Sequence, residues 1–538
     1  MKPVGIKQVS NVTTRPSTIK GLNAFDSIVT MGDGYAILLR NMFAQPYGCQ
    51  IRHGYRRQCT ENISGIVETL ASHNFNDKFP KLYAWSNGSP GEGGNATLYD
   101  VTDEGQPAIF VANYTNARWQ TINFANAAGV HLIAVNGADP LLWFPMDGTL
   151  PPVQVIEGDG TGDTIKGVDP KLFTDVYSHQ KRLWFVEKDS MRCWYMPPDQ
   201  ITGEAKSFNL GGIFTRGGYI MQIITWTIDD GDGSDDHLLF ITSEGQVACY
   251  AGIDPSSANS WSLKGVYFAG APLSNRTAVR YGGDVIMITQ FGLVLMSDLL
   301  KSTKVNPNQD NIAQKVQQLI SLAASEQRHR FGWQTFVYPG ANMVMINIPI
   351  SDTTSYQLVM NDITKAWSEF IGYNAKCWVL HDQKPYFGNM GRVDQAWSGT
   401  TDDNYFSVVD NRDITGAEIR AEVQSTFSAF DSLGIQKHYK MVRPSILSRG
   451  QFNLSLAVNV DFQFDTPLAP SSYALIKPGV WNEDLWDDAV WDGGLISYQQ
   501  WQAVTGIGSF ASIRMLLRSS QETYWACMDW LYEQGGVM

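Results

Sequence analysis

The sequence predicts a mainly β protein: a β-propeller core of about six blades, an additional β-rich domain and one inserted helix. Three observations predict this class. Short apolar runs are rich in β-branched and aromatic residues, which favour strands. Gly, Asn, Asp and Pro separate these runs and supply tight turns. Strand pairs of similar pattern recur about every 45–55 residues between 80 and 400.

Most of the apolar runs are four to seven residues long, the usual length of a strand. In chain order they lie at 81–85, 130–135, 182–186, 237–242, 284–289, 343–348 and 357–360. Polar turns then lead into second strands. Asn136-Gly137 precedes an apolar run at 140–144, and Ser243-Glu-Gly245 precedes another at 246–250. Glycine accepts the positive φ of tight hairpins, so both sites are predicted to be hairpins.

Antiparallel units repeated on this period are typical of propeller blades with about four strands each. Six blades fit the span from about 67 to 400. An array of β-sandwiches is the alternative that the pattern leaves open.

One segment follows a helical period. Residues 308–324 come after Asn306-Pro307, and Asp310 or Asn311 can cap the start of a helix. The apolar residues that share one face are Ile312, Val316, Leu319, Ile320 and Ala323. This segment is predicted to be a helix packed on the surface of the sheet.

The pattern changes near residue 405, where polar and apolar residues alternate at 418–427 and 452–462. Such alternation is typical of half-buried antiparallel strands. The predicted organisation is therefore an N-terminal segment at 1–66 with entry strands and an interface, a propeller core at 67–404 and a β-rich domain at 405–538. A strand at 512–518 is expected to close the last domain.

Composition excludes several classes of protein. The 538 residues include 40 Lys+Arg and 53 Asp+Glu, so the net charge is −13, which disfavours a surface that grips nucleic acid by its phosphates. No run approaches the ~20 apolar residues of a membrane helix, and the first 14 residues lack the apolar stretch of a signal peptide. The six cysteines are expected to be buried thiols in a reducing compartment. Cys49 and Cys59 alone are close enough in sequence to suggest a disulfide.

No motif indicates catalysis. The eight histidines are dispersed, and HExxH, GxSxG and Walker-type loops do not occur. We therefore expect no enzyme activity, no cofactor and no metal site. The acidic loop at 229–236 has oxygen-bearing side chains at 230, 232 and 234 that suit Ca²⁺, but Asp235 stands where an EF-hand needs glycine. A solvated hairpin loop is the expectation there.

Two segments are candidates for contacts with other proteins. The densest basic patch contains Arg52, Arg56 and Arg57, and it is predicted to face a partner or to end a solvated strand. A second candidate is the tryptophan-rich stretch with Trp481, Trp486 and Trp491. It could stack sugars, but core or subunit interface is the more common use of such residues.

The chain resembles the tail nozzle proteins of short-tailed bacteriophages, also called tail tubular protein B or packaged-DNA stabilisation proteins. The segments that carry the resemblance lie at 21–26, 36–43, 46–55, 239–247, 250–255, 261–267, 270–272, 333–339, 347–349, 437–440 and 443–444, with Trp367, Phe387-Gly388 and the Trp-Asp pairs at 486 and 491. They are structural signatures and are spread over nearly the whole sequence.

The resemblance implies a homohexameric ring at the distal end of a virion tail, assembled in the host bacterial cytoplasm. The ring would extend the DNA conduit below the portal and a tail adaptor protein, retain packaged DNA and open for ejection. Tail fibre, spike or needle proteins would lie nearby. Double-stranded DNA would pass through the lumen without sequence-specific binding, which an acidic lining would favour.

Within such a ring, Asp229, Asp230, Asp232, Asp235 and Asp236 are candidates for a channel or gate loop. Two other functions remain open on the sequence. A carbohydrate-binding or carbohydrate-cleaving propeller would need a pocket lined by stacked tryptophans, with two carboxylates placed for cleavage. An intracellular scaffold propeller would be a stable monomer that never enters a particle.

Overall fold

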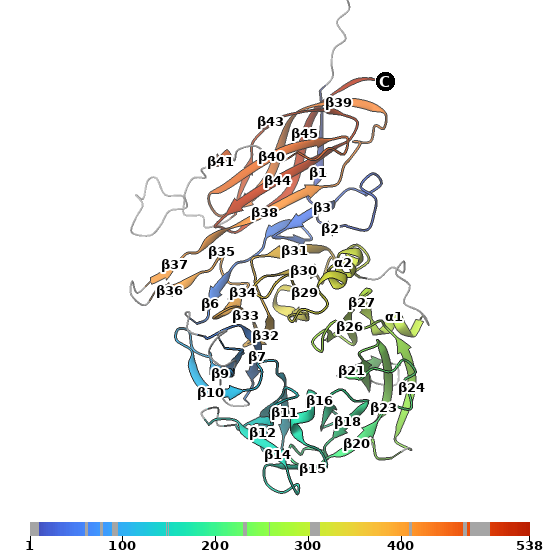
Figure 1. The fold of residues 1–538 in the computed structure, drawn as a ribbon. Coiled ribbons are helices and arrows are strands. Elements are labelled where there is room, and N and C mark those ends of the chain that lie inside the picture. The colour runs from blue at the N-terminus through green and yellow to red at the C-terminus, as the bar shows by residue number, and fades with distance from the viewer. Residues whose placement is uncertain are drawn as a thin grey trace, which may run out of the picture.

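The protein is a ring of β-sheets joined at one edge to a β-sandwich (Figure 1). The computed structural model describes residues 10–59, 63–75, 79–88, 95–146, 148, 150–229, 234–257, 259–301, 312–407, 412–465, 471–473 and 495–537. Within them the chain is mainly β, as the sequence predicts, and the ring has the arrangement of a β-propeller.

Five of the ring's sheets are separate blades of at least four strands. The first has β7 (Val67–His73), β8 (Lys81–Ser86), β9 (Ala96–Asp100) and β10 (Ala108–Tyr114). The second has β11 (Gln120–Asn126), β12 (Gly129–Val135), β13 (Leu141–Phe144), β14 (Val153–Glu157), β15 (Thr164–Lys166) and β19 (Gly203–Glu204). The third, after the 3-10 helix η1 (Pro170–Leu172), has β16 (Phe173–His179), β17 (Arg182–Glu187), β18 (Arg192–Tyr195) and β20 (Lys206–Asn209).

The fourth blade has β21 (Ile220–Asp229), β22 (Ser234–Thr242), β23 (Gln246–Gly252) and β24 (Trp261–Phe268). The fifth has β32 (Cys377–His381), β33 (Lys384–Gly388), β34 (Val393–Ala396) and β6 (Tyr55–Arg57). Between the fourth and fifth blades lie a three-stranded sheet and a four-stranded meander. The former has β25 (Ala278–Tyr281), β26 (Asp284–Thr289) and β27 (Gly292–Leu295). The latter has β28 (Gln334–Tyr338), β29 (Met343–Pro349), β30 (Ser355–Asn361) and β31 (Trp367–Ile371), with η2 (Pro339–Ala341) in a turn.

The seven meanders close into a ring. Their first strands, β7, β11, β16, β21, β25, β28 and β32, each contact the next around the axis, and β32 contacts β7. The N-terminal strand β6 pairs with β34 and so completes the last blade. The count in the described residues is thus seven meanders, five of them separate blades, where the sequence predicts about six blades.

The local predictions of strands and turns are confirmed. All seven apolar runs lie in strands, from β8 to β30. Both predicted hairpins form, β12 with β13 and β22 with β23. Gly137 and Gly245 have φ of +71° and +81° in their turns, which is the conformation for which glycine is favoured.

The sandwich packs two sheets made from both ends of the chain. One contains β1 (Ser10–Pro16), β4 (Met42–Gln45), β5 (Gly48–Ile51), β39 (Ile435–Ser448), β42 (Ile496–Gln499), β43 (Gln502–Gly508) and β45 (Thr523–Val537). The other contains β2 (Gly21–Leu22), β3 (Tyr35–Arg40), β35 (Thr401–Asp402), β38 (Ala417–Ser425), β40 (Phe452–Val460), β41 (Ser471–Tyr473) and β44 (Ala511–Ser519). A hairpin of β36 (Tyr405–Ser407) and β37 (Arg412–Ile414) projects beside them.

The predicted closing strand at 512–518 is β44, which lies between β38 and β40. A further strand, β45, follows it and pairs with both β39 and the N-terminal β1. Pairing of β3 with β31 joins the second sandwich sheet to the β28–β31 meander, giving one sheet of eleven strands that runs through both parts of the molecule.

The described residues contain two helices, α1 (Met296–Lys301) beside the β25–β27 sheet and α2 (Gln317–Gln327), which contacts both β27 and β29. The sequence predicts one helix, at 308–324. Residues 302–311 lie outside the described part, 312–316 form turns, and the helix begins at Gln317. Ile320 and Ala323 are buried in the largest core cluster, as the helical pattern predicts. Pairing of α1 with the β26–β27 hairpin was not visible in the sequence.

Candidate functional site

The propeller encloses a cavity of about 280 Å³ on its axis. Residues of the inner strands line it, including Thr69, Gln120, Asp175, Gln222 and Cys377. These positions recur at the same place in successive blades because each blade begins with its inner strand. The axis is therefore the place where distant parts of the sequence meet.

Arg276 lies in the wall of this cavity, just before β25. Its guanidinium donates hydrogen bonds to the carbonyl oxygens of Glu68 and Trp119, at 2.8 and 2.7 Å, and to Oγ1 of Thr69 at 2.7 Å. All three acceptors are neutral. Burial is the largest effect on Arg276 and lowers its pKa, although neighbouring acids oppose the shift.

Asp175 faces the same cavity from β16 and is buried. Its Oδ2 accepts the N–H of Ile223 at 3.0 Å. Burial raises the pKa of Asp175 to about 8, against the smaller opposing effects of backbone hydrogen bonds and of Arg276. At neutral pH this carboxyl group is mainly protonated, because its pKa lies above 7.

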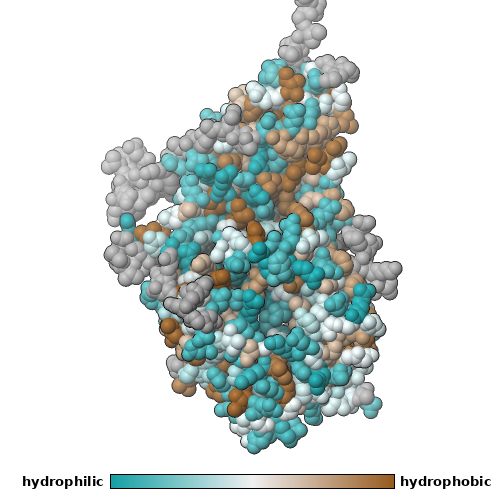
Figure 2. Space-filling model, viewed as in Figure 1, coloured by the Kyte–Doolittle hydropathy of each residue, from teal (hydrophilic) through white to brown (hydrophobic). Residues whose placement is uncertain are grey.

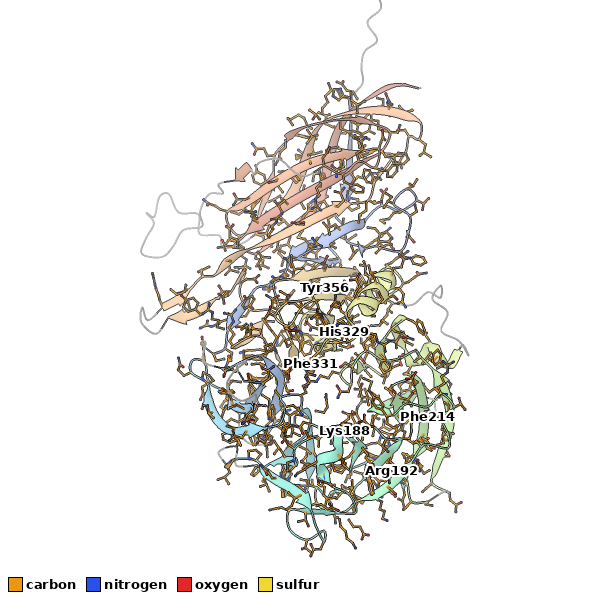
Figure 3. All side chains as sticks on the ribbon, viewed as in Figure 1. Lys188, Arg192, Phe214, His329, Phe331 and Tyr356 are labelled. Atoms are coloured by element: carbon orange, nitrogen blue, oxygen red, sulfur yellow. The ribbon has the colours of Figure 1, made fainter. Side chains whose placement is uncertain are left out.

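A second cavity, of about 530 Å³, opens where the inner strands begin. The segments before β11, β21, β25 and β28 form its wall, together with the β17–β18 turn. Its cationic residues are Arg118, Lys188, Arg328 and Arg330, with His329 beside them, and Asp189 is the carboxylate among its lining residues. In Figure 3, Lys188 and Phe331 lie on opposite sides of the centre of the ring. This mouth is positively charged on a chain whose net charge is −13.

Phe331 holds two of the arginines in place. The guanidinium of Arg118 lies 4.5 Å from the ring centroid and that of Arg276 lies 5.3 Å from it. Arg118 also forms an ion pair with Glu68 at 3.2 Å. Cation–π contacts of this kind fix the direction of a guanidinium without neutralising its charge.

The three arginines predicted as interface residues make contacts within the chain. Arg52 is buried and binds Asp402 through two hydrogen bonds, at 2.8 and 2.7 Å. It also donates to Oδ1 of Asn41 at 2.9 Å and to the carbonyl of Ile371 at 2.6 Å. Its side chain therefore joins the propeller to the sandwich and cannot face a partner, so the interface prediction for Arg52 is wrong.

Arg56 and Arg57 are closer to the surface. Arg56 forms ion pairs with Glu104 at 2.7 Å and with Asp413 at 3.0 Å. Arg57 binds Asp403 at 2.6 Å. Interface roles for these two remain predictions.

The candidate gate loop lies at the tip of the β21–β22 hairpin. Asp229 and Asp235 are in its strands, Asp230 and Asp232 lie outside the described residues, and Asp236 is exposed and accepts a 2.7 Å hydrogen bond from Thr227. Because inner strand β21 begins at the mouth cavity, its other end at Asp229 lies at the opposite face of the propeller. Trp481, Trp486 and Trp491 also lie outside the described residues.

All six cysteines are free. Cys527 is partly exposed and the others are buried, and Cys49 and Cys59 are not bonded to each other. A search of the described residues finds no group of His, Cys, Asp and Glu arranged to hold a metal ion. Within the same residues no helix has the length and apolar character needed to cross a membrane.

Sequence reasoning missed the axial cavities. Arg118, Lys188, Arg276 and the Arg328-His329-Arg330 cluster are far apart in the sequence and form no motif. The position of three of these residues could have indicated an axial location, since Arg118, Arg276 and Arg328 each precede an inner strand. Using that signal would have required the strand boundaries of every blade.

Comparisons with known proteins give structural similarity alone. No protein-family model matches the chain, and no curated protein matches it. Among solved structures, the β-propeller domain of Cps50 (Swd1) from Myceliophteria thermophila is 11% identical, with a TM-score of 0.38, and the match covers 63% of this chain and 99% of that one. BBS1N, solved in complex with ARL6DN, is 10% identical, with a TM-score of 0.39, over 64% and 96%.

The exo-β-1,3-galactanase of Phanerochaete chrysosporium, solved with β-1,3-galactotriose, is 9% identical, with a TM-score of 0.24, over 88% of this chain and 100% of that one. These values carry no argument about function. The propeller assignment rests on the strand pairing of the chain itself.

Proposed function

We propose that the chain is a structural subunit of a virion tail, and that six copies form the nozzle ring that extends the DNA conduit and holds it closed until ejection. The observation that carries this proposal is an apolar row across the outer face of the sandwich. The row marks a surface suited to burial against another copy of the chain.

The row crosses four adjacent strands. Val12 of β1 pairs with Leu531 of β45, Leu531 pairs with Met441 of β39, and Met441 pairs with Ala503 of β43. Val12 is 58% exposed and Ala503 is exposed, and Leu531 and Met441 between them are partly exposed. Figure 2 shows apolar residues gathered along the right-hand side of the sandwich. Contiguous exposed apolar residues are typical of sites that bind another protein.

The close packing between the propeller and the sandwich also supports the proposal. Segments 21–26, 36–43 and 333–339, three of those that carry the family resemblance, lie together where the propeller meets the sandwich. A Cβ atom at Gly21 would lie 2.6 Å from backbone atoms of Trp367, so this glycine permits the close contact. A subunit that withstands the pressure of packaged DNA needs such a continuous connection.

In this ring an adaptor binds above, and fibre, spike or needle proteins attach nearby. DNA passes without sequence-specific contacts, since a chain with a net charge of −13 repels phosphates overall. The role requires shape and ring closure, with no catalytic step.

The test is cryo-electron microscopy of the particle that encodes the chain, with sixfold averaging along the tail. We expect six copies at the distal end of the tail, below the adaptor. Absence from the particle, or a peripheral position as a spike, would contradict the proposal.

A variant pair tests the surface itself. Val12→Lys with Ala503→Lys places charges at both ends of the row, so we expect folded protein that no longer enters particles. Ile253→Lys is the matched control, because Ile253 is 69% exposed on the propeller and away from the row. Equal incorporation of both variants would exclude the row as the subunit interface.

A further inference from the structure

The two axial cavities are neighbours. Gln120 and Asn275 line both the mouth of about 530 Å³ and the inner cavity of about 280 Å³. Cavities of this size accommodate small ligands, and a propeller axis brings residues from many blades to one point. The question is which chemistry the lining selects.

At the inner end, Arg276 is a positioned cation without a counter-ion. Its three hydrogen-bond acceptors are two carbonyl oxygens and a hydroxyl oxygen. The carboxylate of the nearby Glu68 forms its ion pair with Arg118 instead, and among the described residues no carboxylate accepts a hydrogen bond from Arg276. Asp175 shares the cavity but is mainly protonated at neutral pH, because burial raises its pKa to about 8. A partly buried guanidinium whose hydrogen-bond acceptors are neutral attracts an anion.

The mouth adds further positive charge. Lys188 donates to the carbonyl oxygen of Gly137 at 3.2 Å, which leaves its charge in place. Arg328 is exposed and makes no ion pair in the part of the chain that the structure describes. Arg330 donates to Oε1 of Gln327 at 2.6 Å and forms a long ion pair, at 3.5 Å, with the exposed Asp352. Cations on separate loops around one concavity concentrate anions there.

Neutral polar groups complete the lining. The side-chain amides of Gln120 and Asn275 make no hydrogen bond to other described residues, although both residues are only partly exposed. An amide both donates and accepts hydrogen bonds, which suits the hydroxyl groups of a sugar. The site thus combines oxyanion-binding cations with hydroxyl-binding amides.

We propose that the axial site binds a small anionic saccharide. Its phosphate or carboxylate group binds the mouth cations Lys188 and Arg328, and its hydroxyl groups reach inward to Gln120 and Asn275, towards Arg276. The shared chemistry is an oxyanion carried on a polyhydroxylated ring, which either a sugar phosphate or a uronic acid supplies. The site belongs to the single chain and does not depend on the proposed role in a virion.

Binding is measured by isothermal titration calorimetry on the purified full-length chain, with four probes. Glucose 6-phosphate and glucuronate represent the two sources of charge. Glucose lacks the charge, and inorganic phosphate lacks the ring. We expect at least one of the two anionic sugars to bind about tenfold more tightly than both glucose and phosphate, and the stronger of the two identifies the source of the oxyanion.

Variants locate the site. Lys188→Ala with Arg328→Ala removes two exposed cations from the mouth and should weaken binding of the anionic sugar about tenfold or more, with an unchanged melting temperature. Lys264→Ala is the matched control, because Lys264 is exposed on the outer strand β24 and does not line the cavity. Gln120→Leu with Asn275→Leu should weaken sugar binding and leave phosphate binding unchanged.

The proposal is overturned by any of three results: no binding of either anionic sugar, phosphate binding as tight as that of the sugars, or equal affinity in the Lys188/Arg328 and Lys264 variants. Each result is obtained on isolated protein. A particle without the chain would instead refute the nozzle proposal and leave the saccharide site standing, so the two failures are distinguishable.

Discussion

Arg52 shows how one residue can join two parts of a protein. Its guanidinium contacts Asn41 at the start of the sandwich, Ile371 at the end of β31 and Asp402 in β35. It also lies 4.3 Å from the ring centroid of Tyr373. A charge buried with this many partners is held in one geometry, and its removal leaves several polar groups without a partner.

We therefore predict that Arg52→Met lowers the free energy of unfolding by about 3–5 kcal/mol, the range for breaking a buried ion pair. Arg56→Met should cost about 0–1 kcal/mol, because the Arg56 pairs are solvent-accessible. Urea denaturation followed by tryptophan fluorescence measures both. Similar losses for the two variants would show that Arg52 is not the more deeply integrated residue.

Asp175 predicts a pH dependence of stability. Its pKa is raised to about 8 in the folded chain by burial, from 3.8, so its contribution is full below pH 4 and is lost as the pH rises towards 8. Asp175→Asn retains an oxygen for the Ile223 N–H and does not ionise. We expect the stability of the variant, relative to the natural chain, to increase steadily between pH 5 and 8 in thermal unfolding scans. A constant difference across that range would mean that Asp175 does not titrate there.

His73 and His179 act in the opposite direction. Burial lowers the pKa of each to about 4, so the stability that they contribute is present above pH 6.5 and is lost as the pH falls towards 4. Comparison at pH 5–8 with the Asp175→Asn variant cancels this effect, because both proteins contain the same histidines.

The hairpin turns are the elements that the sequence predicts best. Gly245, between β22 and β23, has φ +81°, and a Cβ atom there would lie 2.2 Å from the backbone of Gly270. Gly282, between β25 and β26, has φ +60°, and a Cβ atom there would meet nothing within 4 Å. The two turns have similar backbone conformations but different surroundings.

Substitution by alanine separates these two effects. Gly282→Ala should cost about 1–2 kcal/mol, from the left-handed conformation alone. Gly245→Ala should cost about 3 kcal/mol or more, since the backbone at Gly270, in the connection between β24 and β25, must also shift. Equal losses in denaturant titrations would show that the contact with Gly270 relaxes freely.

Predictions from the sequence were accurate where interacting residues are close together in the chain and failed where they are far apart in the chain. Strands such as β8 and β26 could be predicted because their partners are adjacent in the chain. Arg52 could not be placed, because its partner Asp402 is 350 residues away. Large separations along the chain also prevented prediction of the pairing of β1 with β45 and of the convergence of Arg118, Arg276 and Arg328 on the axis. The candidate site was therefore not predicted, although most of the strands that form it were predicted.

At the scale of the whole molecule, the joined eleven-stranded sheet couples the propeller to the sandwich. The largest core cluster continues across this junction and includes Trp333 and Trp367 of the propeller with Trp525 and Trp530 of the sandwich. Neither part buries its apolar residues fully without the other. The two parts should therefore behave as one cooperative unit.

We predict a single transition in differential scanning calorimetry, with a van't Hoff enthalpy close to the calorimetric enthalpy. The far-ultraviolet and tryptophan signals should change at the same temperature. Two resolved transitions would mean that the propeller unfolds independently of the sandwich.

The pairing of β1 with β45 also determines how long β1 must wait for its partner during synthesis. In synthesis the first strand leaves the ribosome long before its partner, because β1 ends at Pro16 and β45 begins at Thr523. At about 5–20 residues per second, roughly half a minute to two minutes separate them. Throughout that interval β1 exposes an unpaired edge of the kind that recruits other chains. Each new polypeptide must therefore keep its opening strand unengaged until its final strand is made.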